Sequence, residues 1–159
     1  MGSQVLVFVR QIEHGNKIIE MLCDSNGMFC IQSDEIEFAH GSDIDRKAKI
    51  KAFQSGNLRI LIGSSIISEG LNFFCDAGIN AAGGDSEIDV IQKLGRILRK
   101  SRPVGGDVSL DSKDVRFYDI TDKDHPVFKK HAKFRLETYD KLGFPATPVL
   151  AKDFVLGID

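Results

Sequence analysis

The chain has 159 residues, of which 42% are hydrophobic and 28% charged, and its formal net charge is −2. This composition is typical of one globular domain with a substantial core, and it excludes low-complexity, collagen-like and strongly basic proteins. The net charge supplies no global positive field, so any contact with nucleic acid requires a local basic patch.

The cysteines and the apolar runs bear on the compartment. Cys23, Cys30 and Cys75 are an odd number without a C-x-x-C pair, so we expect buried thiols in a reducing cytoplasm and no metal site. No apolar run approaches membrane-spanning length, which predicts no membrane contact. Residues 1–3 resemble a cloning remnant followed at once by a strand, and we expect a domain taken from a longer protein.

Alternating strand and helix patterns run along the chain. Val5–Val9 is a continuous apolar run rich in β-branched valine, typical of a strand buried on both faces of a parallel sheet. Further strands are expected at 36–40, 58–63, 77–82 and 115–120, with helices ending near 23, 56, 99 and 142. This order predicts an α/β domain with a mainly parallel sheet and right-handed crossovers.

Two helix starts carry capping signals. Ser42 followed by Asp45 is close to a capping box and predicts a helix that begins after Ser42 and ends at Gly56. Ser86 followed by Asp89 repeats the pattern before the helix expected at 88–99.

The helix expected at 88–99 carries two stripes. Gln92, Arg96 and Arg99 fall at i, i+4 and i+7 and share one face, where both arginines suit a phosphate. Another face, suited to burial against the sheet, consists of Val90, Leu94 and Ile97. Gly95 costs about 1 kcal/mol relative to alanine in a helix, which predicts a close-packing reason for it. The alternative for the arginines is a solvated basic face.

Polar and glycine residues follow the expected strands. They occur at Arg10-Gln11, His40-Gly41, 64–72 and 83–85. In parallel sheets, ligands bind at the loops beyond the carboxyl ends of the strands. The sequence therefore predicts that this edge of the sheet is the functional one.

These segments, in this order, resemble the second RecA-like domain (the helicase C-terminal domain) of superfamily 2 helicases and translocases. The first strand with Arg10 is similar to motif IV, residues 60–72 to motif V, and Gln92–Arg99 to the motif VI pattern Q-R-x-G-R-x-x-R. The stretch from Phe38-Ala39-His40-Gly41 to Gly56 resembles the segment before motif V. The resemblance implies a three-layer RecA-like domain, with helices on both faces of the sheet, over residues 4–144.

Two finer expectations concern the C-terminal part. The strand at 115–119 and the residues Arg135, Tyr139 and Gly143-Phe144 look most like phage and repair-type DNA helicases. Arg135 and Tyr139 are expected to have packing roles. The tail, residues 145–159, contains several apolar side chains and is expected to dock on the domain.

The resemblance implies roles for the matched positions. Arg96 and Arg99 would be the catalytic residues, reaching the γ-phosphate of ATP, with Arg99 as an arginine finger worth about 10³–10⁵ in rate. The implied ATP-binding residues are Gln92, Gly70, Asn72, Arg96 and Arg99. The implied nucleic-acid-binding residues are Arg10, Gly41, Ser64 and Ser65, which would bind backbone phosphates without sequence preference.

Some positions depart from the common family pattern. Ser64-Ser65 stands where many members have Thr-Asp, and Asn72 where Asp is frequent. Lys93 replaces the more usual arginine and so gives up bidentate geometry.

No phosphate-cradling G-x-x-x-x-G-K-[ST] loop occurs in the sequence. ATP and Mg²⁺ would therefore be held mainly by a separate N-terminal RecA-like domain, and we expect no ATP turnover from this chain alone. The expected function is the C-terminal motor domain of an ATP-dependent helicase or translocase acting on DNA, with RNA as the other candidate polymer. The alternative is a non-catalytic nucleic-acid-binding or regulatory module with the same fold.

Overall fold

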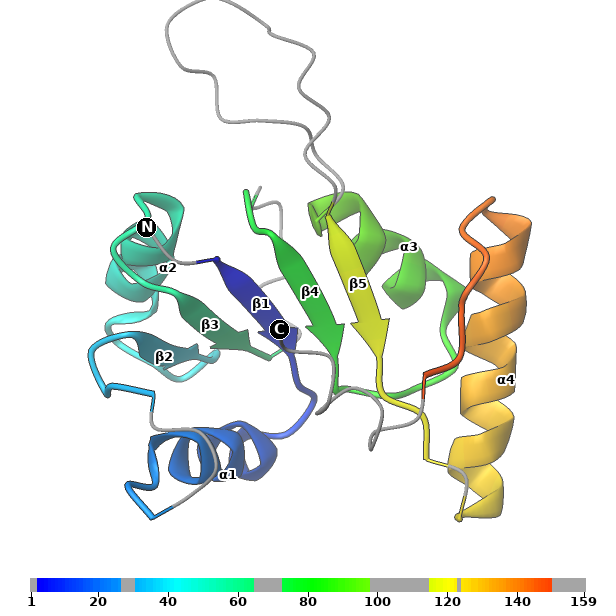
Figure 1. Cartoon of the computed structure of the whole chain (residues 1–159), viewed down its shortest axis with the longest axis horizontal. Helices are drawn as coiled ribbons and strands as arrows, with labels where there is room; N and C mark the ends of the chain where they lie inside the picture. Colours follow the sequence, from blue (N-terminus) through cyan, green and yellow to red (C-terminus); the bar gives the residue numbers. More distant parts are fainter. Residues whose placement is uncertain (1–2, 27–30, 65–72, 98–114, 123, 150–159) are drawn as a thin grey trace, which may run out of the picture.

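The computed structural model describes residues 3–26, 31–64, 73–97, 115–122 and 124–149. Strands and helices alternate along these residues, as Figure 1 shows. They are β1 (Val5–Phe8), α1 (Ile12–Cys23), β2 (Ile36–Ala39), α2 (Arg46–Gln54), β3 (Ile60–Gly63), β4 (Ala77–Asn80), α3 (Glu87–Ile97), β5 (Arg116–Asp119) and α4 (Pro126–Lys141).

The strands form a five-stranded sheet in the order β2-β3-β1-β4-β5, and every pairing is parallel. Phe8 at the end of β1 lies opposite Gly63 of β3 and Asn80 of β4, and Asn80 lies opposite Asp119 of β5. The carboxyl ends therefore meet at one edge. The structure confirms the predicted α/β domain with a parallel sheet.

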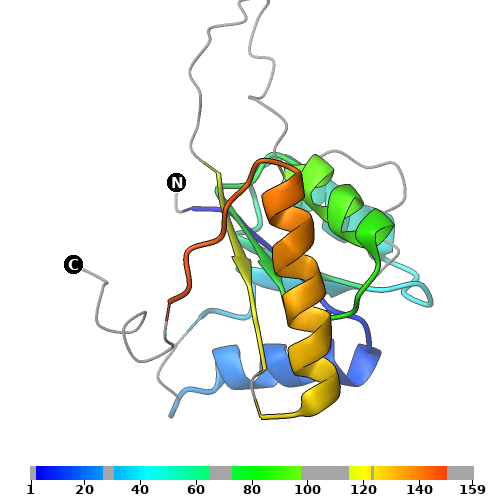
Figure 2. The same ribbon diagram turned by 90° about the vertical axis from the view of Figure 1, so that its right-hand side faces the viewer.

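Helices cover both faces of this sheet. On one face, Val7, Val9 and Ile62 form a cluster with apolar side chains of α1. On the other, Leu6 and Phe8 pack in a cluster that includes residues of α2 and α3. Figures 1 and 2 show α1 on the opposite side of the sheet from α2 and α3. The alternation along β1 confirms a strand buried on both faces, in a three-layer domain.

The last helix, α4, packs against α3 and covers the end of the sheet beside β5 (Figure 2). Tyr139 of α4 is buried with Val90 and Leu94 of α3, and its ring lies 5.9 Å, centroid to centroid, from that of Phe117 on β5. Because α3 is held between the sheet and α4, its orientation depends on both.

Two glycines set how closely helices approach the sheet. A β-carbon added to Gly15 of α1 would lie 2.5 Å from Cζ of Phe38 on β2. A β-carbon on Gly78 of β4 would overlap Cδ1 of Ile97 on α3. The absence of a side chain at both positions lets α1 and α3 sit close to the sheet.

One expected helix start was wrong. The helix α2 begins at Arg46, and residues 42–45 form a turn instead of its first turn. The Ser42 hydroxyl lies 3.0 Å from Nδ1 of His40, and the Asp43 carboxylate accepts from the backbone N–H of Asp45 at 3.1 Å. These bonds give the two side chains local partners, so neither caps the helix.

The second capping prediction is confirmed. The Ser86 hydroxyl accepts from the backbone N–H of Asp89 at 3.3 Å, as predicted. Cys75 is buried, as expected, and Cys23 is only partly buried, whereas Cys30 lies outside the described residues. In the part of the chain that the structure describes, no helix has the length and apolar character needed to cross a bilayer.

Candidate nucleotide and nucleic-acid interface

The predicted site residues follow the carboxyl ends of neighbouring strands. Arg10 follows β1, Gly41 follows β2 and Ser64 follows β3, and the aligned strand ends bring them to one edge of the sheet. Ser65, Gly70, Asn72 and Arg99 lie outside the described residues. The structure therefore bears on part of the predicted constellation, and the remainder stays a prediction.

Arg10 is exposed and lies beside the loop that follows β4. A β-carbon placed on Gly84 would be 3.9 Å from Nη1 of Arg10. Gly83 and Gly84 have φ values of 64° and 89°, a conformation that favours glycine. The connections from β1 and β4 leave in opposite directions along the sheet, so Arg10 occupies the switch point where ligands bind in such folds.

The turn that contains Gly41 is tied to α2. Nζ of Lys49 lies 2.9 Å from Oδ2 of Asp43 and 3.2 Å from Oε2 of Glu37, and it donates to the carbonyl of Phe38 at 3.1 Å. Its hydrogen bond holds the pKa of the Asp43 carboxyl below the usual value. These contacts order the turn on both sides of His40-Gly41, so its backbone is fixed before any ligand arrives.

Ser64 is buried at the end of β3, with 6% of its surface exposed. Its backbone N–H donates to the carbonyl of Ala39 at 3.3 Å, and its hydroxyl has no hydrogen-bond partner among the described residues.

The exposure pattern along α3 matches the two predicted stripes. Val90, Leu94 and Ile97 are buried, whereas Gln92 is exposed and Arg96 partly exposed. The explanation expected for Gly95 was wrong: this residue is exposed, and no described atom lies within 4 Å of an added β-carbon. Gly95 therefore belongs to the open face of the helix.

Lys93 points into the protein, which the sequence comparison with motif VI did not indicate. It is 5% exposed, and its Nζ lies 2.7 Å from Oδ2 of Asp89 and 3.0 Å from Oδ1 of Asn80. The ammonium group also lies 5.9 Å from the centroid of the Phe8 ring. The Asp89–Lys93 spacing of four residues is the sequence signal that could have revealed the ion pair.

A second buried polar group joins α4 to the same edge. Arg135 donates from Nε and Nη2 to the carboxylate of Asp119, and from Nη1 to the carbonyl of Gly84 at 2.8 Å. The Tyr139 hydroxyl donates to Oδ2 of Asp119 at 2.5 Å. Burial, aided by the negative charge of Asp119, raises the pKa of Tyr139 well above its usual value. The packing roles expected for Arg135 and Tyr139 are confirmed.

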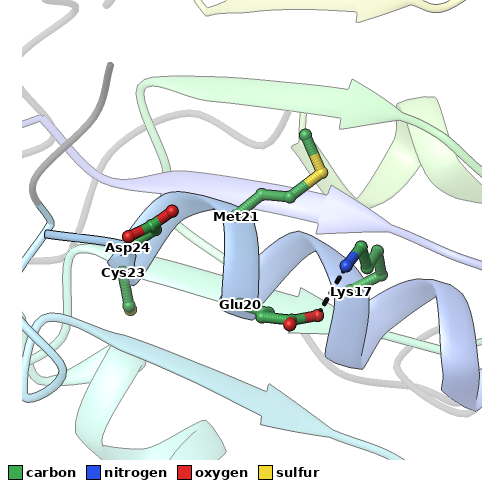
Figure 3. Close-up of a pocket in the computed structure, with 5 residues that line it drawn as sticks. All are labelled: Lys17, Glu20, Met21, Cys23 and Asp24. Atoms are coloured by element: carbon green, nitrogen blue, oxygen red, sulfur yellow. Dashed lines mark hydrogen bonds and ion pairs between the residues drawn. The ribbon is translucent and has the colours of Figure 1, made fainter. Parts of the chain in front are cut away.

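A hollow of about 430 Å³ lies away from this edge, along the second half of α1 (Figure 3). Its lining residues are Lys17, Glu20, Met21, Cys23 and Asp24, none of which is a predicted site residue. Among the residues that the structure describes, no three or more His, Cys, Asp or Glu side chains gather in a way that could hold a metal ion.

Comparisons with known proteins agree with this architecture. The helicase conserved C-terminal domain family matches residues 1–101. The structure of the C-terminal domain of the DEAD-box protein Dbp5 is similar to this chain, with a TM-score of 0.62 and 18% sequence identity. The match covers 90% of this chain and 72% of the Dbp5 chain. No curated protein matches the chain.

Larger solved structures share the fold over a smaller part of their length. The Pyrococcus furiosus Hef helicase domain gives a TM-score of 0.56 and 21% identity, over 84% of this chain and 24% of that one. Saccharomyces cerevisiae Dbp5 bound to RNA and ADP BeF3 gives a TM-score of 0.67 and 18% sequence identity. That match covers 97% of this chain and 36% of the Dbp5 chain. The chain belongs to the helicase conserved C-terminal domain family and has the RecA-like fold of helicase C-terminal domains.

Proposed function

We propose that this chain is the second motor domain of an ATP-dependent helicase or translocase, working with an N-terminal RecA-like domain of the same protein. The observation that carries this proposal is the face of α3. Gln92 is exposed and Arg96 partly exposed on a helix whose opposite stripe is buried, and the sequence spacing assigns Arg99, which lies outside the described residues, to the same face. An open face with a forked cation suits the phosphates of a nucleotide held by a neighbouring domain.

The catalytic role assigned to Arg96 and Arg99 is to stabilise charge on the γ-phosphate in the transition state, with Arg99 as the arginine finger. Gly70 and Asn72 would line the same cleft, and Gln92 would contact the nucleotide. The phosphate-cradling loop is absent from the sequence, so the N-terminal domain would hold ATP and Mg²⁺. The isolated chain is then expected to have no turnover.

Nucleic acid would bind along the carboxyl edge of the sheet. Arg10 is exposed there, and the Gly41 turn is held in place by Lys49. Ser64 and Ser65 would supply hydroxyls to a further phosphate. Contacts of this kind follow the backbone, so binding is expected to be sequence-tolerant and to weaken steeply with salt.

We propose DNA as the polymer, in a phage or repair-type helicase. The support is the resemblance to such helicases over β5, Arg135, Tyr139 and Gly143-Phe144. The side chains of Arg135 and Tyr139 form a buried cluster with Asp119. The similar solved structures do not decide between DNA and RNA. One Dbp5 structure contains RNA, and the Hef structure is named only as a helicase domain.

The alternative is a binding module that never completes an ATPase site. The test is ATP turnover by the full-length parent protein, measured without polymer, with single-stranded DNA and with single-stranded RNA of the same length. Stimulation of turnover by DNA supports the proposal. Stimulation by RNA alone would show that the polymer is RNA and not DNA. Absence of ATP turnover in all three conditions supports the binding module instead.

A further inference from the structure

A buried positive charge lies beneath the face of α3 that carries the proposed nucleotide contacts. Lys93 stands between Gln92 and Arg96 in sequence but points toward the sheet, and it is 5% exposed. Removing an ammonium group from water is costly, and a buried ion pair often contributes no net stability relative to apolar packing. Since apolar side chains fill the neighbouring buried positions of α3, stability alone does not account for a lysine here.

The contacts of Lys93 join three elements. Asp89, 2.7 Å from Nζ, lies one turn earlier on α3, and Asn80, 3.0 Å from Nζ, ends β4. The ring of Phe8, 5.9 Å from the ammonium, ends β1. Asn80 is completely buried, and Phe8, its partner in the sheet register, is 3% exposed. The lysine therefore connects the middle of α3 to the carboxyl ends of the two strands at the switch point.

Such a connection fixes the rotation of the helix about its own axis. Successive residues of an α-helix are separated by about 100° around the axis, so a modest rotation redirects every side chain on the opposite face. The apolar contacts of Val90, Leu94 and Ile97 are non-directional and tolerate small rotations. The hydrogen bond from the ammonium to Asn80 of β4 is directional and tolerates them less, and the bond to Asp89, which lies within α3, orients the lysine for it.

We propose that Lys93 is a positioning residue: oriented by Asp89 of its own helix, it binds Asn80 of β4 and so sets the rotation of α3 and the direction of Gln92 and Arg96. The inference rests on the proposed function, because it requires that face to act on a nucleotide. The usual arginine at this position of motif VI would, on this account, be replaced by a lysine that reaches inward without touching ATP.

The start of α3 has a separate support. Arg135 binds the Gly84 carbonyl at 2.8 Å, and Nε2 of His131 lies 3.4 Å from Oδ2 of Asp85, so α4 contacts the loop before the helix at two points. These contacts hold the helix start, whereas Lys93 acts half-way along it. Loss of Lys93 is therefore expected to leave α3 folded but misdirected.

The test compares Lys93→Met, which keeps length and removes charge, with Lys93→Arg, which keeps the charge. In the full-length parent protein, the readouts are kcat and KM for ATP and the ratio of the Kd for ADP to that for ADP with aluminium fluoride, a transition-state analogue. Transition-state analogues bind on the order of 10² or more times tighter than ground-state ligands. Lys93→Met should lower this ratio and kcat by about tenfold or more, and leave KM nearly unchanged.

Lys93→Arg should restore most of the ratio. The matched control is Val90→Ala, which removes buried apolar volume from the same helix and leaves the polar contacts intact. A merely structural role lowers the active fraction but does not alter a ratio of affinities. An unchanged ratio in Lys93→Met, or an equal fall in Val90→Ala, overturns the inference.

Three further variants complete the design. If Lys93→Met does not fold, Asn80→Ala, which leaves the contact with Asp89, is judged by the same ratio. Arg96→Ala and Arg99→Ala are measured in parallel. If both retain native turnover, the proposed function fails; if they lose it while Lys93→Met keeps the native ratio, the positioning inference fails and the proposed function stands.

Discussion

Arg135 and Asp119 form a two-point ion pair, with Nε 2.8 Å from Oδ2 and Nη2 2.9 Å from Oδ1. The pair joins α4 to β5, and both side chains are less than a tenth exposed. The fifteen residues between the two positions include the turn from the sheet into α4, so this contact closes the C-terminal part of the domain. Paired geometry of this kind requires a guanidinium, which a lysine does not reproduce.

Replacing Arg135 should therefore destabilise the chain strongly. Arg135→Met leaves the Asp119 carboxylate buried without its counter-ion, which typically costs about 3–5 kcal/mol. The measurement is the free energy of unfolding in urea. Lys133→Met is the matched control, because Lys133 is 79% exposed and its pair with Glu137 should contribute less than about 1 kcal/mol. Equal losses in both variants would contradict the structural role of the pair.

Tyr139→Phe tests the same cluster through pH. The hydroxyl of Tyr139 donates to Asp119, and burial raises its pKa in the folded chain. The protonated phenol thus stabilises the fold fully below the unfolded pKa of about 10, and this contribution is lost as pH rises above it. We expect the native chain to lose more unfolding free energy between pH 9 and 11 than Tyr139→Phe does. Parallel pH profiles would show that the phenol proton is not linked to folding.

Two glycine-to-alanine changes in helices should have opposite signs. In Gly15→Ala the new β-carbon would meet the ring of Phe38 at 2.5 Å, so we expect a lower free energy of unfolding despite better helix propensity. In Gly95→Ala no described atom lies within 4 Å, and a gain of up to about 1 kcal/mol is expected. Thermal melting of the two variants measures the difference, and a stabilised Gly15→Ala would refute the close approach of α1 to β2.

Lys49→Met should weaken nucleic-acid binding without a contact of its own to the polymer. The lysine holds Asp43 and the Phe38 carbonyl on either side of Gly41, and releasing that turn should cost about 1 kcal/mol, roughly fivefold in affinity. Fluorescence anisotropy with single-stranded DNA measures the change at fixed salt. Lys47→Met, an exposed lysine on the same helix, is the control for loss of one positive charge. An equal loss of affinity in Lys49→Met and Lys47→Met would show that the loss of one positive charge, and not the release of the turn, weakens binding.

The parts of the fold that follow from local pattern could be read from the sequence. Val5–Val9 predicts a strand with both faces buried, and in the structure Leu6 and Phe8 face one layer while Val7 and Val9 face the other. The period of α3 likewise separates its buried stripe from the Gln92–Arg96 face. Both predictions depend on residues within one element, where spacing alone determines which side chains share a face.

The parts that depend on tertiary contacts could not be read in this way. The burial of Lys93 requires Asn80, thirteen residues earlier, to be placed beneath α3 by the pairing of β4 with β1. The contact of Arg135 with the Gly84 carbonyl spans 51 residues. The Ser42 signal failed for a local reason, because the ring of His40, two residues earlier, gives that hydroxyl a partner other than the helix start.

The central claim is that Arg99 acts as an arginine finger in an ATPase completed by another domain. Its most direct test is DNA-stimulated ATP turnover by the full-length parent protein carrying Arg99→Ala, measured together with ATP binding. Arg59→Ala is the control, because Arg59 pairs with Glu35 at the opposite edge of the sheet. We expect Arg99→Ala to lose about 10³-fold or more in turnover while ATP binding persists and the control is unaffected. Native turnover in Arg99→Ala would contradict the motor assignment and leave the binding module in its place.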